Sequence, residues 1–177
     1  MNLEGFARWI GFGRPPPNCA AVARQLFRVC VENDPLVAAV TYPANELSES
    51  LRPRFQSRWR LYREATVLAL LRSREQRDAR YSEIVKEYER LILASEQITP
   101  ERLAKVADLD AAIKDINELI QSGTSGAELS WARNWFRELG EIPRKLVSCM
   151  IFGGACLRFW TTTEKTLAQM ADDGILP

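Results

Sequence analysis

The sequence predicts an all-α protein organised around a three-helix unit, with further helices before and after it. Three long stretches repeat apolar residues at helical spacing, and Leu61, Ala65 and Leu68 mark the first of them. The second stretch runs from Tyr81 to Ile92 and the third from Leu103 to Ile120. With 177 residues, 46% of them hydrophobic and 27% charged, the chain can bury a substantial core.

Residues 1–51 predict an N-terminal arm followed by short helices. Three prolines at 15–17 form a stiff connector, and the asparagine after them can cap a helix from Cys19 to about Glu32. Pro35 can open a short apolar helix, and Pro43 is expected to end it. This segment is therefore an addition to the three-helix unit.

Residues 52–121 predict the three-helix unit itself. Its first helix is expected from Arg54 to about Gln76, and it carries arginine around an apolar face. Thr99 supplies an N-cap for the third helix, and Pro100 suits the first turn of that helix. These signals place the three helices one after another with short connections.

Residues 122–177 predict a C-terminal helical extension. Serine and glycine pairs at its start indicate a break, and helices follow at residues 127–140 and from Pro143 to about residue 160. Thr161 and Glu164 have the spacing of a capping box, which predicts a separate final helix. The extension therefore contains three expected helices.

Charge is distributed unevenly along the chain, although the net charge of the whole is only +1. Residues 52–80 contain nine arginines and three acidic residues, a net charge of +6. Residues 81–141 contain seven basic and twelve acidic residues, a net charge of −5. Either the basic helix pairs with acidic neighbours in the same chain, or it forms a docking surface for an acidic partner.

Two smaller features have two interpretations each. Asp110 interrupts the apolar face of the third helix, so it lies at the edge of that face or opposite an arginine, and we favour the edge. Trp131 and Trp135 lie on a strip beside an apolar face. They either pack in the core, which we favour, or anchor another subunit, because tryptophan is common at binding hot spots.

The triplet Leu61-Tyr62-Arg63, followed by Leu70-Leu71-Arg72 and further arginines, resembles the signature of the mitochondrial LYR-motif proteins. Members of that family are small antiparallel three-helix proteins. They serve as accessory subunits or assembly factors of respiratory complexes and of iron–sulfur cluster biogenesis. Many bind the mitochondrial acyl carrier protein, whose acylated phosphopantetheine arm enters between the helices. The resemblance covers about residues 58–121.

The resemblance implies two sets of functional side chains. Those expected to contact the acidic carrier, or to shape the helix junction beside it, are Arg58, Arg60, Tyr62, Arg63, Arg72, Arg74 and Arg77. Those expected to line a tunnel for the acyl chain are Leu61, Leu68, Val85, Tyr88 and Ile113.

The resemblance also implies a function and a location. The chain would be a non-catalytic accessory subunit or assembly factor of a respiratory-chain complex, in contact with acyl carrier protein and with other subunits. It would lie on the matrix side of the inner mitochondrial membrane. It would need no cofactor of its own, beyond the acylated phosphopantetheine of a bound carrier. Without the resemblance, the sequence would favour a cytoplasmic protein.

The residue types argue against an enzyme. The chain has no histidine, which removes the commonest general base and the commonest zinc ligand. Paired carboxylates such as Glu83 and Glu87 lie on a charged outer face, where they are expected to be solvated. No glycine-rich phosphate loop or calcium loop is found in the sequence. We therefore expect no catalytic residues and no metal site.

The four cysteines are expected to be buried and reduced. Cys19 and Cys30 are eleven residues apart, whereas Cys149 and Cys156 are seven apart. Two parallel disulfides between helices would not align with such different spacings. Neither pair has the tight spacing of a zinc or redox site.

A second class of function is a nucleic-acid-associated protein. In that case the arginines of residues 52–80 would grip phosphates, as in a ribonucleoprotein component. The nearly neutral chain and the lack of a groove-reading motif make this the weaker hypothesis. The sequence also contains no run of about 20 apolar residues, so we expect no membrane-spanning helix.

Overall fold

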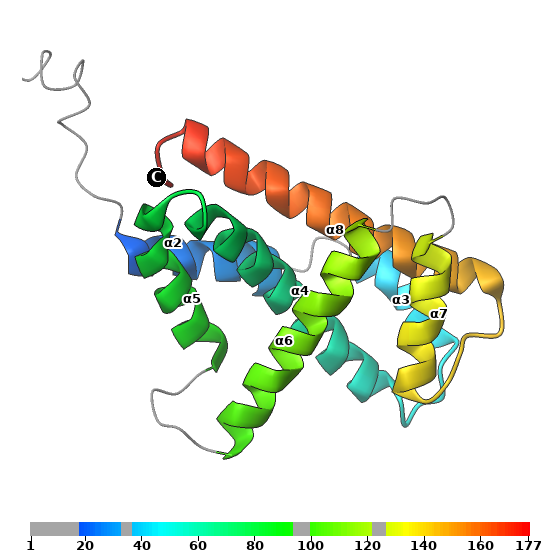
Figure 1. Cartoon of the computed structure of the whole chain (residues 1–177). Helices are drawn as coiled ribbons and strands as arrows, with labels where there is room; N and C mark the ends of the chain where they lie inside the picture. The colour runs from blue at the N-terminus through cyan, green and yellow to red at the C-terminus, as the bar shows by residue number, and fades with distance from the viewer. Residues whose placement is uncertain (1–17, 33–36, 94–99, 122–126) are drawn as a thin grey trace, which may run out of the picture.

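The computed structural model describes residues 18–32, 37–93, 100–121 and 127–177. Within these residues the chain forms α-helices joined by short turns and no β-strand, so the all-α prediction is confirmed (Figure 1). The elements are α2 (Cys19–Leu26), the π-helical turn η1 (Phe27–Glu32), α3 (Val37–Asn45), α4 (Arg52–Glu75), the 3₁₀ turn η2 (Ala79–Tyr81), α5 (Ser82–Leu93), α6 (Pro100–Gln121), α7 (Ala127–Leu139) and α8 (Leu146–Asp172). The predicted arm, the cap at Thr99 and the serine–glycine break lie outside the described residues.

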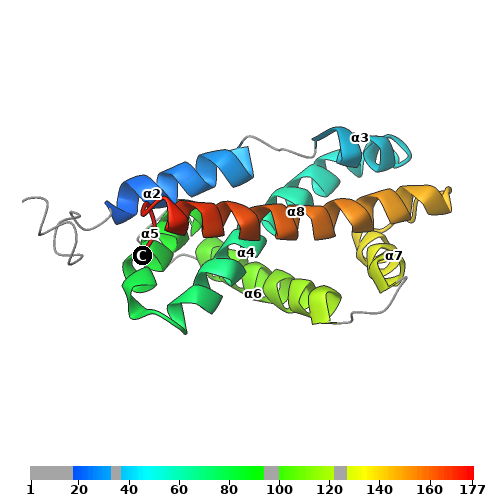
Figure 2. The same cartoon turned by 90° about the horizontal axis from the view of Figure 1, so that it is seen from above.

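Helix α4 is the centre of the molecule. All ten residues from Tyr62 to Leu71 are buried, because η1, α5, α6 and α8 pack around it (Figures 1 and 2). The sequence between Ala65 and Leu71 is apolar on every side except at Thr66, and a helix of that kind belongs in a core. Thr66 satisfies its hydroxyl locally, by donating to the carbonyl oxygen of Tyr62 at 2.9 Å. The predicted apolar stripe is therefore only part of a helix that is buried all round.

The three predicted helices of the central unit are present as α4, α5 and α6, and α4 packs against each of the other two. Helix α2 packs against α5, whereas α3 and α7 pack against α8, near its start (Figure 2). The buried apolar side chains of these helices form one cluster. The helices before and after residues 52–121 thus contribute to the same core as α4.

Helix α8 differs from the sequence prediction, because the two helices expected around Thr161 are one continuous helix. Thr161 does not act as an N-cap, since its hydroxyl donates to the carbonyl oxygen of Arg158 at 3.1 Å. The helix ends where Gly174 adopts a φ of 68°, which lets the amides of Ile175 and Leu176 reach the carbonyl oxygen of Met170.

Two shorter helices also depart from the prediction. Helix α3 continues to Asn45 with Pro43 inside it, so this proline lies in the last turn and does not end the helix. The helix that begins at Cys19 widens at Phe27 into the π-helical turn. The side chain of Asn18 accepts from the amide of Ala21 at 3.1 Å, as its predicted capping role requires.

No helix in the described part of the chain is both long and apolar enough to cross a membrane.

Candidate binding groove along α4

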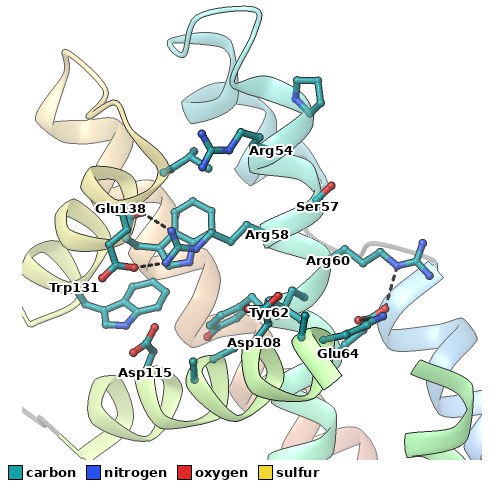
Figure 3. Close-up of a pocket in the computed structure, with 18 residues that line it drawn as sticks. Arg54, Ser57, Arg58, Arg60, Tyr62, Glu64, Asp108, Asp115, Trp131 and Glu138 are labelled. Atoms are coloured by element: carbon teal, nitrogen blue, oxygen red, sulfur yellow. Dashed lines mark hydrogen bonds and ion pairs between the residues drawn. The ribbon is translucent and has the colours of Figure 1, made fainter. Parts of the chain in front are cut away.

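An open groove runs along one side of α4, between α6 and α7 (Figure 3). Its volume is about 1040 Å³. Its lining residues are Pro53, Arg54, Ser57, Arg58, Arg60, Leu61, Tyr62, Glu64, Ala104, Lys105, Asp108, Ala111, Ala112, Asp115, Trp131, Trp135, Glu138 and Leu139. The groove exists because α6 crosses α4 at an angle and diverges from α7, as Figure 1 shows.

Aromatic rings form the inner wall of the groove. The ring centroids of Tyr62 and Trp131 lie 5.8 Å apart, and Trp131 stacks on Phe152 of α8 with centroids 6.2 Å apart. Trp135 is buried beneath them, 4.5 Å from Phe152. Trp135 therefore packs in the core, whereas half-buried Trp131 contributes a face to the groove.

The charged groups of the groove balance one another. Four side chains of the lining are cationic and four are anionic: Arg54, Arg58, Arg60 and Lys105, and Glu64, Asp108, Asp115 and Glu138. The groove therefore combines an apolar wall with a rim of both signs, and it carries no net charge.

Arg58 joins α4 to α7 at one end of the groove. Its guanidinium forms an ion pair with Glu138 and donates to the carbonyl oxygen of Trp135 at 3.3 Å (Figure 3). The same group lies 4.8 Å from the centroid of the Trp135 ring, a cation–π arrangement. Arg58 is thus occupied by contacts within the chain.

Asp115 lies beside this pair, on α6. Desolvation raises the pKa of its carboxyl above the ordinary value, and the nearby carboxylate of Glu138 raises it further. Arg58 opposes this effect. The carboxyl of Asp115 therefore lies in the electrostatic field of both members of the Arg58–Glu138 pair.

Glu64 joins α4 to α6 at the other end. It is only 2% exposed, and its carboxylate oxygens lie 3.1 Å from Arg60 Nε and 3.1 Å from Lys105 Nζ. A buried carboxylate needs such partners, because an unpaired one would be strongly disfavoured. Arg60 is therefore also engaged within the chain, although its side chain is 57% exposed.

Arg63, the arginine of the triplet, faces inward. It is 8% exposed and donates to the carbonyl oxygen of Val31 at 2.6 Å. Its guanidinium lies 5.6 Å from the ring of Trp59. Val31 belongs to the π-helical turn, where the ordinary α-helical hydrogen-bond pattern is interrupted. Arg63 thus fixes η1 to α4 and does not present its charge to solvent.

Tyr62 also makes a contact inside the protein. It is buried, and its hydroxyl donates to the carbonyl oxygen of Cys156 on α8 at 3.1 Å. Burial raises the pKa of this phenol well above its ordinary value. The tyrosine and the arginine of the triplet therefore tie α4 to two different neighbours.

The remaining arginines of the predicted partner surface lie at the far end of α4. Arg72 pairs with Glu89 at 2.9 Å and with Asp110 at 3.4 Å. Asp110 is exposed, as expected at the edge of the apolar face of α6, and it also faces Arg72. The two interpretations of this residue are therefore compatible. Arg74 donates to the carbonyl oxygen of Glu164 at 3.4 Å, and Arg77 is exposed after the helix end.

The residues predicted to line an acyl tunnel all belong to the core cluster or pack against it. Leu61 lines the groove, whereas Leu68, Val85 and Tyr88 are buried in the core between α4 and its neighbours. Ile113 is half-buried on α6. Burial raises the pKa of Tyr88 well above its ordinary value, and its hydroxyl has no hydrogen-bond partner among the described residues. Leu61 is thus the one member of this set that reaches the groove.

No disulfide joins any of the four cysteines, all of which the structure describes. Cys30, Cys149 and Cys156 are buried, and burial raises the pKa of Cys30 to about 11 despite a hydrogen bond with Thr163. Among the described residues, no group of three or more cysteine, aspartate or glutamate side chains is placed to hold a metal ion.

Several residues of the groove were not singled out from the sequence. Arg54, Lys105 and Asp115 all line it, and none of them belongs to the LYR-like triplets. The apolar wall depends on how α7 packs across α4, which no spacing within either helix reveals. For the wall formed by α7, the sequence contained one signal. This was Trp131, for which one of the two interpretations was an anchor for another subunit.

Comparison of the chain with protein-family models, with curated proteins and with solved structures gives no match.

Proposed function

We propose that this chain is a non-catalytic binding protein whose groove along α4 receives an elongated, largely apolar group presented by a partner protein. The observation that carries the proposal is the open groove of about 1040 Å³, with Leu61, Tyr62 and Trp131 in its wall. Binding sites for small molecules are concave and mostly apolar, with a few polar groups that fix orientation. This groove has an apolar wall of that kind, and it adds charged groups of both signs along its rim.

An alkyl chain is the group that such a wall suits best. Each methylene moved from water to an apolar surface contributes about 0.8 kcal/mol. The wall extends along α4 from Pro53 to Glu64 and continues across Ala104 to Asp115 on α6. A chain lying along it would contact the aromatic rings, while its polar end stayed at the charged rim.

The resemblance to LYR-motif proteins makes an acylated acyl carrier protein the partner to test first. In this proposal the chain is an accessory subunit or assembly factor of a respiratory complex, on the matrix side of the inner mitochondrial membrane. The acyl chain would follow the groove beside Leu61, because the side chains of Leu68 and Tyr88 fill the space on the other side of α4. Specific binding would come from the apolar wall of the groove more than from Arg58 or Arg60 on its rim.

Pairing of the arginines also favours this proposal over nucleic-acid binding. Arg58, Arg60 and Arg72 each contact a carboxylate of the same chain, and Arg63 is buried. A guanidinium already paired in this way would have to exchange its partner for a phosphate. Three carboxylates from other helices, Glu89, Asp110 and Glu138, thus offset part of the net positive charge of residues 52–80.

The test is direct binding of acyl carrier protein in two forms, one with a long acyl chain and one with free phosphopantetheine. We expect the acylated form to bind more tightly, measured by calorimetry. Ala111→Trp should weaken this binding, because Ala111 lines the groove. Ala107→Trp is the matched control, since Ala107 is exposed on the same helix and does not line the groove.

Equal binding of the two carrier forms, or equal binding by the two tryptophan variants, would contradict a role of the groove. Absence of binding by the unmodified chain to either form would remove the carrier from the proposal.

A further inference from the structure

A second surface of the molecule, at the start of α8, is apolar and uncovered. Among the described residues, seven large apolar side chains are exposed, and five of them lie at this end of the molecule. These five form what we call the α8 patch: Tyr42, Leu146, Val147, Met150 and Ile151. In the view of Figure 2 no other described helix passes in front of the start of α8.

Two neighbouring glycines distinguish the inner side of α8 from this outer side. A Cβ atom on Gly153 would come within 2.5 Å of the backbone oxygen of Glu128, so close packing of α7 requires glycine there. A Cβ atom on Gly154 would meet nothing within 4 Å. Gly154 costs the helix about 1 kcal/mol relative to alanine, and no contact with the described residues explains it.

The row of residues along the outer side has a self-complementary shape. Leu146, Met150 and Gly154 are four residues apart, so they lie above one another on one ridge of the helix. Leu146 protrudes one turn before Met150, with 54% of its surface exposed, and Gly154 leaves a hollow one turn after it. A second α8, running antiparallel and crossing at Met150, would set each Leu146 over the Gly154 of its mate.

We propose that the α8 patch binds a second copy of this chain, through a two-fold axis that passes close to Met150. A two-fold interface requires one surface to fit itself, and the equal spacing of protrusion and hollow about Met150 meets that requirement. Glycine in the hollow leaves room there for the Leu146 side chain of the other copy.

The charges around the patch suit a second copy better than an anionic membrane. Lys145 pairs with Glu46 at 3.3 Å and lies over the ring of Tyr42. Glu141 lies before the helix and Arg158 is exposed two turns beyond Met150, on opposite sides of the proposed axis. A two-fold axis therefore brings the Arg158 end of one copy toward the start of α8 in the other, where exposed Arg144 lies beside Glu141 and both signs of charge are present. An anionic lipid surface would favour cations alone.

The size of the patch sets the strength of the expected dimer. Stable complexes bury roughly 800 Å² on each partner, usually with 20 to 30 residues. Five apolar side chains and their rim are fewer than that. The dimer should therefore form and dissociate with protein concentration, and its dissociation should be measurable by dilution.

Sedimentation equilibrium over a wide concentration range tests the proposal. The unmodified chain should shift from monomer to dimer as its concentration rises. Met150→Glu should raise the dissociation constant by at least about tenfold, because it places two carboxylates at the axis. Gly154→Trp should do the same by filling the hollow, and Leu103→Glu, at an exposed leucine of α6, should leave the dimer unchanged.

Met150→Cys supplies a positive test, because a residue at a two-fold axis lies beside its own mate. Mild oxidation should give a disulfide-linked dimer of this variant, whereas Leu103→Cys and the unmodified chain, whose native thiols include three buried ones, should stay monomeric on a denaturing gel.

Circular dichroism of each variant shows that it is folded before its mass is interpreted. An unmodified chain that stays monomeric at every concentration overturns the proposal. This holds also if the monomer binds anionic vesicles and Met150→Glu abolishes that binding. A dimer that ignores both Met150→Glu and Gly154→Trp overturns it as well.

Discussion

Arg63 and Arg77 are the same residue type only fourteen positions apart, yet they lie in opposite environments. Arg63 is buried against Trp59 and donates to the backbone of Val31, whereas Arg77 is exposed just after the end of α4. The long apolar stem of an arginine can add to packing while its guanidinium serves a carbonyl. A buried arginine of this kind acts on stability, and an exposed one acts on solubility and on partners.

Replacing the buried arginine tests this difference. Arg63→Met keeps much of the side-chain volume but leaves the carbonyl oxygen of Val31 without its donor. We expect a loss of about 1–3 kcal/mol in the free energy of unfolding, measured by urea denaturation. Arg77→Met is the control and should change that free energy by less than about 0.5 kcal/mol. Equal effects of the two changes would show that Arg63 does not hold η1 against α4.

Asp115 gives a prediction about pH. Its pKa is raised in the folded protein, so folding favours the protonated carboxyl and the ionised form weakens the fold at neutral pH. Asp115→Asn should therefore be more stable than the unmodified chain at pH 7. The advantage should shrink as the pH falls toward 3.8, the ordinary pKa, because the carboxyl is then protonated in both states.

Urea denaturation at a series of pH values measures this difference. Asp108→Asn is the matched control, since it removes a carboxylate that lines the same groove from the same helix. A stability gain for Asp115→Asn that persists unchanged at low pH would show that ionisation of Asp115 is not its cause.

At the scale of elements, the contact between α7 and α8 depends on one glycine. Gly153→Ala forces a Cβ atom against the backbone oxygen of Glu128, and a backbone atom has little room to move. We expect this variant to lose about 1–3 kcal/mol of unfolding free energy. Gly154→Ala should instead gain about 0.5–1 kcal/mol, because alanine is the better helix former and the added methyl meets open space. Thermal unfolding of the two variants at low concentration measures the difference.

The sequence predicted the positions of the helices better than it predicted which of their faces are buried and which side chains pair. Spacing of Leu61, Ala65 and Leu68 predicted α4 correctly, because a helix repeats every 3.6 residues whatever lies around it. The same spacing did not reveal burial on every side, since η1 and α8, which also cover α4, are distant from it in the sequence. The partners of Arg58 and Arg72 come from other helices as well, so their pairing was left open as one of two interpretations.

The groove illustrates the same limit. Leu61 and Tyr62 were marked as functional because of the triplet that contains them, and both line the groove. Its other walls come from α6 and α7, and only the packing of these helices on α4 brings Asp115 and Trp131 to the same place. A pattern within one helix carries no information on the angle at which another helix crosses it.

At the scale of the whole molecule, the core is continuous from α2 to the C-terminus. Leu26 of α2, Phe136 of α7 and Leu167 of α8 are as deeply buried as the centre of α4. The hydroxyl of Tyr81 also donates to the carbonyl oxygen of Pro177, which joins the start of α5 to the chain end. Such an arrangement should unfold as one unit, because no helix keeps its apolar face covered without the others.

Excision of the central three helices tests this continuity. A fragment of residues 52–121 would expose the sides of α4 that Cys30, Phe152 and Phe159 cover in the intact chain. We expect the fragment to lack a cooperative unfolding transition, whereas the full chain should show one transition that coincides by circular dichroism and by tryptophan fluorescence. A fragment that unfolds cooperatively would instead make residues 52–121 an independent domain, with the other helices as additions to it.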